Sequence, residues 1–279
     1  MNRTAYAERG TEDSFAGPAH VLALANAPSL RPSEVHVWPF ELHADESAFR
    51  LCQGLLNEQE RARAGTFAFE KDRHHHVVAH GVLRHLLSLY SGVPAGAIDF
   101  EHSASGKPKM GPAGKVDAVR APDGSELSFN LSHSHGRALI GVCRGRNIGI
   151  DLEMVRQELD VLSLAESCFF GEELARIRSA PEEQRTELFF RYWVAKEAVL
   201  KGEGIGLGYP LDRFEVRFRS ADDSSCDIMS MDTSQLRDDW TVRVLRLGDG
   251  WPGAVAARGG DWIVRVFRAG PEAPREMLL

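Results

Sequence analysis

The hydrophobic and polar positions of this 279-residue chain follow two periods, which divide it into helices and strands. The longest helical pattern covers residues 71–90, where apolar side chains recur three and four residues apart. It is expected to end near Gly92, because glycine readily adopts the left-handed conformation that closes helices. Asn57 with Glu60 three residues later predicts the capping box of a shorter helix.

Strands and helices follow one another in the same order twice. Before residue 145 we expect a strand at 34–40, helices at 48–56 and after Asn57, the long helix, and strands at 98–101, 127–131 and 138–143. After residue 145 we expect a strand at 148–153, helices at 162–168, 172–179 and 183–201, and strands at 214–218, 241–247, 254–257 and 262–267. Residues 106–124 are rich in Gly and Pro and are expected to form loop and hairpin.

This repetition, with an offset of about 110 residues, is close to the size of a small domain. It predicts an α+β (α/β) fold of two similar halves related by a pseudo-twofold axis, residues 33–145 and 146–270. A site between the halves would follow naturally. Residues 1–32 lack periodicity and are rich in Ala, Pro, Gly and charge, so a disordered or loosely attached extension is expected there.

The composition of the chain argues against two classes of partner, nucleic acids and membranes. The net charge of -7 and the pI near 5.9 argue against a nucleic-acid partner. The four cysteines are widely separated and form no CxxC pair, which is typical of reduced thiols in a cytoplasmic protein. The one apolar stretch near the start, residues 21–27, is too short for a signal peptide or a transmembrane helix, so no membrane partner is expected.

Two short segments carry the candidate chemistry. Asp151 and Glu153 are two residues apart in an expected strand and so share one face. Glu197 and Lys201 are four residues apart in an expected helix and are stacked on one another. Three carboxylates and an ammonium that converge would suit a Mg²⁺ ion that handles a phosphate. The alternatives are a solvent-facing edge strand and an ordinary surface ion pair.

Two further segments are weaker candidates. Ser132-His133-Ser134-His135 follows an expected strand, where an imidazole could donate to a phosphate oxygen, although a plain polar hairpin has the same pattern. Gly106-Lys107-Pro108-Lys109 offers amides and ammonium groups, but such a sequence is usually only a turn. The histidines of 74–85 lack an HExxH motif, and no GxGxxG or GxxxxGK[ST] motif is present, so zinc-protease and ordinary nucleotide-binding interpretations fail.

Taken in order, four motifs are more informative than any one of them: Gly106-Lys107-Pro108, Phe129 to Ser134, Gly149 to Glu153, and Trp193 to Lys201. Between about residue 58 and residue 220 the chain resembles the Sfp-type 4′-phosphopantetheinyl transferases, in the variant with Trp and Lys-Glu-Ala in the last motif. The resemblance implies a monomer with coenzyme A held between two halves. The implied reaction moves 4′-phosphopantetheine from coenzyme A to a serine of an apo acyl or peptidyl carrier protein and releases 3′,5′-ADP.

The resemblance also implies roles for particular residues. Asp151, Glu153 and Glu197 would hold Mg²⁺ against the pyrophosphate. His133 and Lys201 would bind the pyrophosphate and stabilise the leaving group, beside Ser132. Breaking a pyrophosphate bond needs positioning and charge neutralisation more than covalent help, which fits such a set. Either Glu197 or a metal-bound water could accept the serine proton.

The coenzyme A nucleotide would occupy the first half. Lys107 and Pro108 are expected against the adenine, and Lys196 is expected to contact a phosphate or support a residue that does. His75 lies where many relatives carry an arginine for the 3′-phosphate. That contact would then fall to one of the nearby cations, Arg61, Arg63, Lys71 or Arg73. The alternative function is a non-catalytic module that binds coenzyme A or a carrier protein, against which the retained carboxylates and Lys201 argue.

Overall fold

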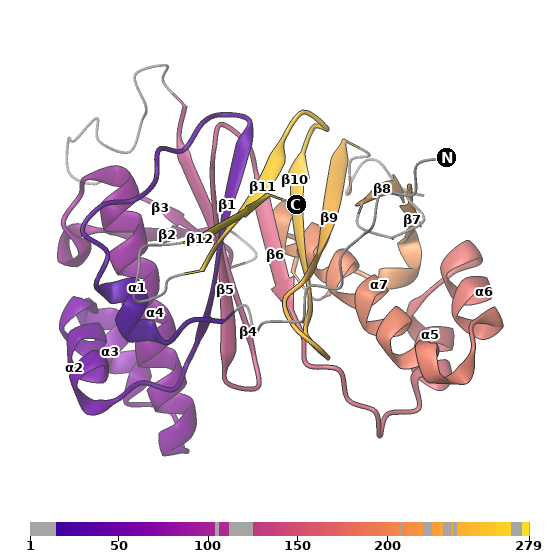
Figure 1. Cartoon of the computed structure of the whole chain (residues 1–279), viewed down its shortest axis with the longest axis horizontal. Helices are drawn as coiled ribbons and strands as arrows, with labels where there is room; N and C mark the ends of the chain where they lie inside the picture. The colour runs from indigo at the N-terminus through magenta and orange to yellow at the C-terminus, as the bar shows by residue number, and fades with distance from the viewer. Residues whose placement is uncertain are drawn as a thin grey trace, which may run out of the picture.

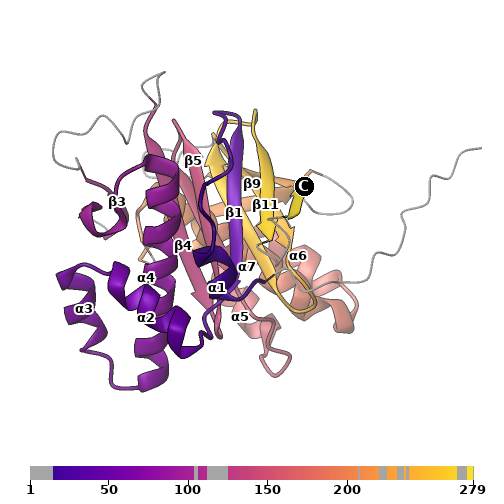
Figure 2. The same ribbon diagram turned by 60° about the vertical axis from the view of Figure 1, so that its left-hand side comes forward.

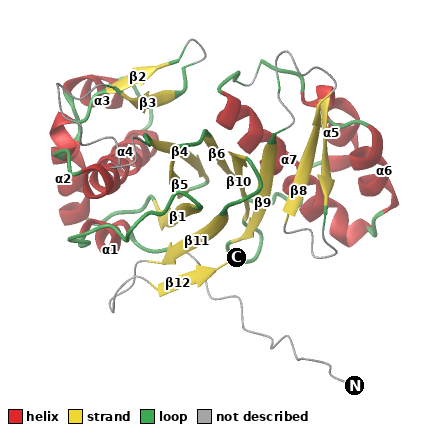
Figure 3. Cartoon of the chain, turned by 90° about the horizontal axis from the view of Figure 1, so that it is seen from above, coloured by secondary structure: helices red, strands yellow, loops and turns green. Residues whose placement is uncertain are grey.

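The computed structural model shows two β-sheets side by side at the centre of the molecule, with a group of helices at each end (Figures 1 and 3). The residues it describes are 15–103, 106–111, 125–206, 208–219, 225–230, 236, 239–268 and 275–278. Within these residues no helix is both long enough and apolar enough to cross a membrane.

Among the residues that the structure describes, the first half contains four α-helices, one 3-10 turn and five strands. In chain order these are α1 (Pro18–Leu22), β1 (Glu34–Glu41), α2 (Glu46–Leu55), α3 (Glu58–Ala64), α4 (Glu70–Ser91), η1 (Ala95–Ala97), β2 (Phe100–His102), β3 (Pro108–Met110), β4 (Leu127–Ser134) and β5 (Arg137–Arg144). The predicted capping box of Asn57 and Glu60 opens α3, and Gly92 with φ 73° ends α4, so both sequence signals are confirmed.

The second half follows a similar plan, and its described residues form two short α-helices and one of 22 residues. Its elements are β6 (Ile148–Leu152), α5 (Val161–Cys168), α6 (Gly171–Ser179), α7 (Glu182–Glu203), η3 (Leu211–Arg213), β7 (Phe214–Phe218), β8 (Ser225–Ser230), β9 (Trp240–Arg246), β10 (Pro252–Arg258), β11 (Ile263–Arg268) and β12 (Arg275–Leu278). The predicted α+β architecture is confirmed, whereas α1, β3, β8 and β12 were not predicted.

Each sheet has two buried faces. The strand orders are β12-β11-β1-β5-β4 and β6-β10-β9-β8-β7. Along β1, Val35 and Val37 lie in a core shared between the two sheets, whereas Trp38 packs on the helices of the first half. This period-two alternation is that of a strand between two packed layers. In β6 the same alternation places Ile150 in the shared core, so the next residue, Asp151, faces the opposite side of the sheet, where the helices lie.

Two predicted boundaries are wrong. The last strand of the supposed second half, β11, lies parallel to β1 in the first sheet, with Glu34 opposite Ile263 (Figure 2). Its buried Val264 and Val266 complete the core that both sheets share. The expected extension at 1–32 is also ordered from residue 15, because Val21 of α1 is 1% exposed in the helical core. Residues 1–14 lie outside the described part.

Candidate active site

The two sheets meet where β4, the edge of the first, runs beside β6, the edge of the second (Figure 3). Side chains at alternate positions of β4 make the junction. Asn130 Oδ1 accepts a hydrogen bond from the Ile150 amide at 2.8 Å, and two and four residues later Ser132 and Ser134 donate to carboxylates. The Phe129 to Ser134 motif is therefore a polar junction between the halves, built on the two-residue period of a strand.

Asp151 is the most enclosed acid of this junction, with 3% of its surface exposed. Its Oδ1 accepts hydrogen bonds from Ser132 Oγ at 2.9 Å and from Lys201 Nζ at 2.5 Å. Lys201 also donates to Ser132 Oγ at 3.0 Å, so the three side chains form a closed set. The second oxygen, Oδ2, is buried and has no hydrogen-bond partner among the described residues, which leaves one carboxylate oxygen of Asp151 as an unused electron-pair donor.

Glu153 follows the end of β6 and is half-buried. Its Oε2 accepts a hydrogen bond from Ser134 Oγ at 2.8 Å. Burial raises the pKa of Glu153, and the neighbouring Asp151 carboxylate raises it further, against the lowering effect of the Ser134 hydrogen bond. Ser134 was not predicted as a site residue. Its position two residues after Ser132 was the signal that could have identified it.

Glu197 completes the acidic cluster from α7 and is 5% exposed. Burial raises its pKa to about 7, and the charge of Asp151 adds to the effect, while Lys201 opposes it. The pKa values of Glu153 and Glu197 are thus both raised by burial and by the Asp151 charge, and a bound cation would relieve this repulsion. Neither a solvent-facing strand nor a surface ion pair describes this arrangement.

Glycines allow α7 to approach β6 closely enough to form the cluster. A Cβ atom at Gly149 would lie 1.9 Å from the carbonyl oxygen of Ala198 and 2.3 Å from the Gly202 amide nitrogen. Any larger residue would therefore separate the strand from the helix. Because Asp151 is two residues beyond Gly149, and Lys201 directly precedes Gly202, this contact sets the spacing across the cleft.

His133 and His75 lie on the opposite, first-half side of the cleft. His133 is exposed, and its pKa is lowered by partial loss of hydration and by the Lys201 ammonium. Burial lowers the pKa of His75 to about 4, and the His43 ring, whose centroid is 5.5 Å away, lowers it further. Both imidazoles are therefore neutral near pH 7, as expected for His75. They can form hydrogen bonds but do not supply a permanent positive charge.

Lys107 has an unexpected partner set. Its Nζ donates to the carbonyl oxygens of Ile148, at 2.8 Å, and Gly202, at 2.6 Å. Burial lowers the pKa of Lys107 to about 8. The ammonium thus fastens the β2–β3 hairpin of the first half to the second half, and the Lys107 stem and half-buried Pro108 remain the parts that could face a nucleotide.

Lys196 is not available to a ligand, so the expected direct contact with a phosphate of coenzyme A is wrong, whereas the alternative, support of a residue that makes such a contact, stays a prediction. Its side chain is 0% exposed and forms an ion pair with Glu173 at 2.8 Å. Its Nζ also donates to the carbonyl oxygens of Leu211 and Phe214. One residue further along a helix points about 100° away, which explains why Glu197 faces the cleft while Lys196 does not.

The cations proposed to replace an arginine at position 75 divide into two groups. Arg61 and Arg73 line a cavity of about 460 Å³ between α2, α3 and α4. Arg73 is two residues from His75 and so lies on nearly the opposite face of α4. Lys71 and Arg63 instead lie close enough to lower the pKa values of His75 and His76, respectively.

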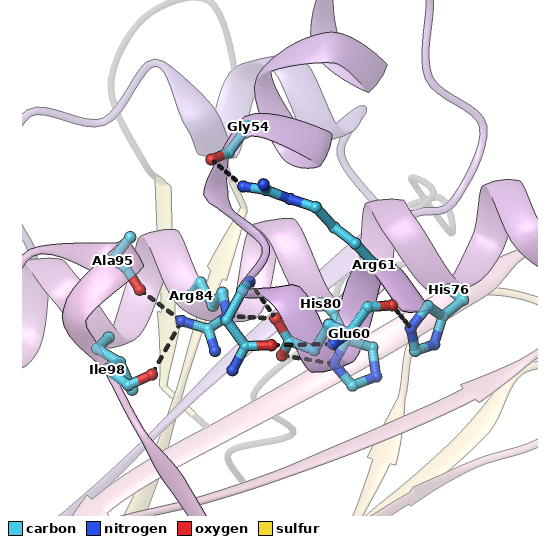
Figure 4. A network of polar contacts seen from close by, with 9 residues as sticks. Gly54, Glu60, Arg61, His76, His80, Arg84, Ala95 and Ile98 are labelled. Carbon is cyan, nitrogen blue, oxygen red and sulfur yellow. Dashed lines mark hydrogen bonds and ion pairs between the residues drawn. The ribbon is translucent and has the colours of Figure 1, made fainter. Parts of the chain in front are cut away.

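A buried network fixes α3 against α4 beside these histidines (Figure 4). Arg84, with 0% exposure, donates from Nε to Glu60 Oε2 at 2.5 Å and from one terminal nitrogen to the carbonyl oxygens of Ala95 and Ile98. Glu60 also contacts His80 Nδ1 at 3.2 Å, and these contacts keep its pKa below the ordinary value despite its burial. The network holds the α3 segment that carries Arg63.

The acidic cluster fits a hard divalent cation by its chemistry. Within the described residues, no three His, Cys, Asp or Glu side chains are already arranged as metal ligands, and Lys201 forms an ion pair with Asp151. Three points nevertheless support the fit: the donors are all carboxylates, Asp151 Oδ2 is buried and unpartnered, and the pKa values of Glu153 and Glu197 are raised.

Fold and cleft together define an α+β enzyme with an acidic site at the junction of two sheets. Residues 147–256 match the model of the 4′-phosphopantetheinyl transferase superfamily, and residues 42–142 match that of the 4′-phosphopantetheinyl transferase N-terminal domain. The chain belongs to this superfamily and is a 4′-phosphopantetheinyl transferase.

Curated relatives extend over both halves. The 4′-phosphopantetheinyl transferase HetI of Nostoc sp. is 39% identical over 67% of this chain and 76% of its own length. A phosphopantetheinyl transferase of Thraustochytrium sp. is 30% identical over 78% of this chain and 76% of its own. The 4′-phosphopantetheinyl transferase Sfp of Bacillus subtilis is 28% identical over 58% of this chain and 66% of its own length.

Proposed function

We propose that this enzyme transfers 4′-phosphopantetheine from coenzyme A to a serine hydroxyl of an apo acyl or peptidyl carrier protein, with Mg²⁺, and releases 3′,5′-ADP. The observation that carries the proposal is the convergence of Asp151, Glu153, Glu197 and Lys201 at the junction of the sheets. An anionic pyrophosphate needs both the cation that the carboxylates would hold and the ammonium beside them.

Each residue of the site has a separate role in the proposed reaction. Asp151, Glu153 and Glu197 would hold Mg²⁺, which supplies charge neutralisation for the pyrophosphate. Lys201 and His133 donate hydrogen bonds to the phosphate oxygens and stabilise the 3′,5′-ADP that leaves. The serine proton needs an acceptor, and we assign this role to Glu197, whose pKa of about 7 suits proton transfer near neutral pH.

The nucleotide of coenzyme A would lie along the first half. Pro108 and the stem of Lys107 would contact the adenine, while Ser132 holds Asp151 and Lys201 in place beside the pyrophosphate. Because His75 is neutral, we assign the contact with the 3′-phosphate to Lys71 and Arg63. Arg61 and Arg73 instead line the cavity between α2, α3 and α4. Both sides of the cleft come from one chain, which supports action as a monomer, and we propose a cytoplasmic location.

Intact-mass spectrometry of apo carrier proteins incubated with the enzyme, coenzyme A and Mg²⁺ tests the reaction. We expect a gain of one phosphopantetheine unit and its loss when EDTA is added. Replacing Asp151 or Glu197 by Ala should lower kcat about 100- to 1000-fold, the cost of losing a group that stabilises charge in the transition state. Coenzyme A binding without transfer to fatty-acid, polyketide or peptide carriers would instead support a non-catalytic binding module.

A further inference from the structure

The part of α7 that carries the site has no single apolar face. Every residue from Val194 to Leu200 is buried, the charged Lys196 and Glu197 included. In an amphipathic helix the boundary between apolar and polar residues fixes the rotation about the helix axis. Here apolar packing surrounds the helix, so its rotation must be specified by directional contacts.

Lys196 supplies such contacts on the side away from β6. Its Nζ lies 2.8 Å from Glu173 Oε2, and the second oxygen of that carboxylate accepts a hydrogen bond from the Val216 amide at 2.6 Å. Two backbone carbonyls, those of Leu211 and Phe214, accept further hydrogen bonds from the ammonium at 2.7 and 2.5 Å. One side chain of α7 is thus tied to α6, η3 and β7 at once.

The opposite side of α7 meets β6. Residues two apart on a helix point about 200° from one another, so Ala198, whose carbonyl oxygen approaches Gly149, lies across the helix from Lys196. The ion pair and the glycine contact therefore hold the helix from two sides. Glu197 and Lys201 lie between these two contacts and face the cleft only in this rotation.

We propose that the buried Lys196–Glu173 pair is a positioning device that fixes the rotation of α7 and so aims Glu197 and Lys201 at Asp151. The inference rests on the proposed metal-dependent transfer. A buried ion pair contributes little net stability compared with well-packed apolar side chains, and its best-attested use is to specify one arrangement among several. Glu173 is therefore a positioning residue, although it touches neither substrate nor metal.

The double variant Glu173→Met with Lys196→Met tests this role, because it removes both charges and keeps apolar bulk. We expect a melting temperature near that of the wild type, but a Mn²⁺ affinity and a kcat each lowered about 10- to 100-fold, with the KM for the carrier unchanged. The matched control is Glu166→Met with Arg178→Met, an exposed ion pair of 2.7 Å between α5 and α6, which should change none of these values.

Mn²⁺ binding is measured by water proton relaxation on the free protein and needs no transfer activity. A double variant with wild-type Mn²⁺ affinity and kcat would overturn the positioning role. If the double variant does not fold, Glu173→Gln with Lys196→Met replaces it, since both charges are still removed and the amide oxygen retains an acceptor for the Val216 amide, and the same loss of Mn²⁺ affinity without loss of melting temperature is expected.

The same measurements separate the two proposals. Wild-type protein that binds Mn²⁺ but modifies no carrier would reject the proposed function and leave the positioning role testable by Mn²⁺ affinity. Wild-type protein that binds no Mn²⁺ would overturn both.

Discussion

At the scale of single residues, Glu197 determines how the cleft responds to protons. An isolated glutamate is ionised above its ordinary pKa near 4.5, but burial and the charges of Asp151 and Glu153 hold that of Glu197 at about 7. In the absence of a cation, the folded protein therefore retains a proton that the unfolded chain releases between these two values. Folding stability without metal must then fall as the pH rises through this interval.

The first prediction uses this linkage. In EDTA, wild-type protein should lose about 3–6 °C of melting temperature relative to Glu197→Gln as the pH rises from 4.5 to above 7, since the glutamine cannot ionise. Adding Mg²⁺ at pH 8 should restore the wild type and leave the variant unchanged. Thermal unfolding across pH measures both proteins. Parallel curves for the two proteins in EDTA would mean that Glu197 is not a buried, proton-binding group.

Sequence spacing predicted which acidic residues share a face because that depends only on local geometry. Asp151 with Glu153, and Glu197 with Lys201, lie where the periods of a strand and a helix place them. The direct phosphate contact expected of Lys196 was wrong for a related reason. The spacing gives the angle between Lys196 and Glu197 around the helix axis, but it does not say which side of α7 faces the cleft. This part of α7 is buried on all sides, so its hydrophobic pattern does not indicate that side either.

At the scale of elements, the contact between β6 and α7 controls the distance across the site. Gly149 lies in a strand, where glycine is ordinarily unfavourable, and it is tolerated here because the backbone of α7 occupies the space of a side chain. The sequence showed the glycine but not what approached it, since Ala198 and Gly202 come from a distant helix. The pairing of β11 with β1 escaped prediction for the same reason.

The second prediction concerns this contact. Gly149→Ala should destabilise the fold by about 3 kcal/mol and lower kcat more than 10-fold, because a methyl group 1.9 Å from the Ala198 carbonyl oxygen must move the strand that carries Asp151. Gly54→Ala is the control. Nothing lies within 4 Å of its added Cβ, and in the last turn of α2 it should raise stability by at most about 0.5–1 kcal/mol. Chemical denaturation and transfer kinetics measure the pair, and normal stability of Gly149→Ala would refute the close approach.

At the scale of the whole molecule, the two halves are joined by more than their shared core. β11 returns from the second half to pair with β1, and Asn130, Ser132 and Ser134 of β4 bond to β6. Lys107 adds a third connection from the β2–β3 hairpin, across to Ile148 and Gly202. A cleft built between halves can hold a fixed geometry only if such connections resist their separation.

The last prediction separates this connecting role of Lys107 from ordinary surface charge. Lys107→Met would leave the carbonyl oxygens of Ile148 and Gly202 without their donor, which should cost about 2 kcal/mol of stability and 4–8 °C of melting temperature. Because the hairpin would then be free to leave the cleft, the KM for coenzyme A should rise several-fold while the KM for the carrier stays constant. Lys109→Met in the same hairpin removes only an exposed pair with Glu101 and should change stability by less than about 0.5 kcal/mol. If both variants raise the KM for coenzyme A equally with no loss of melting temperature, the lysine acts by its charge near the nucleotide, and the halves are held by their strands and core alone.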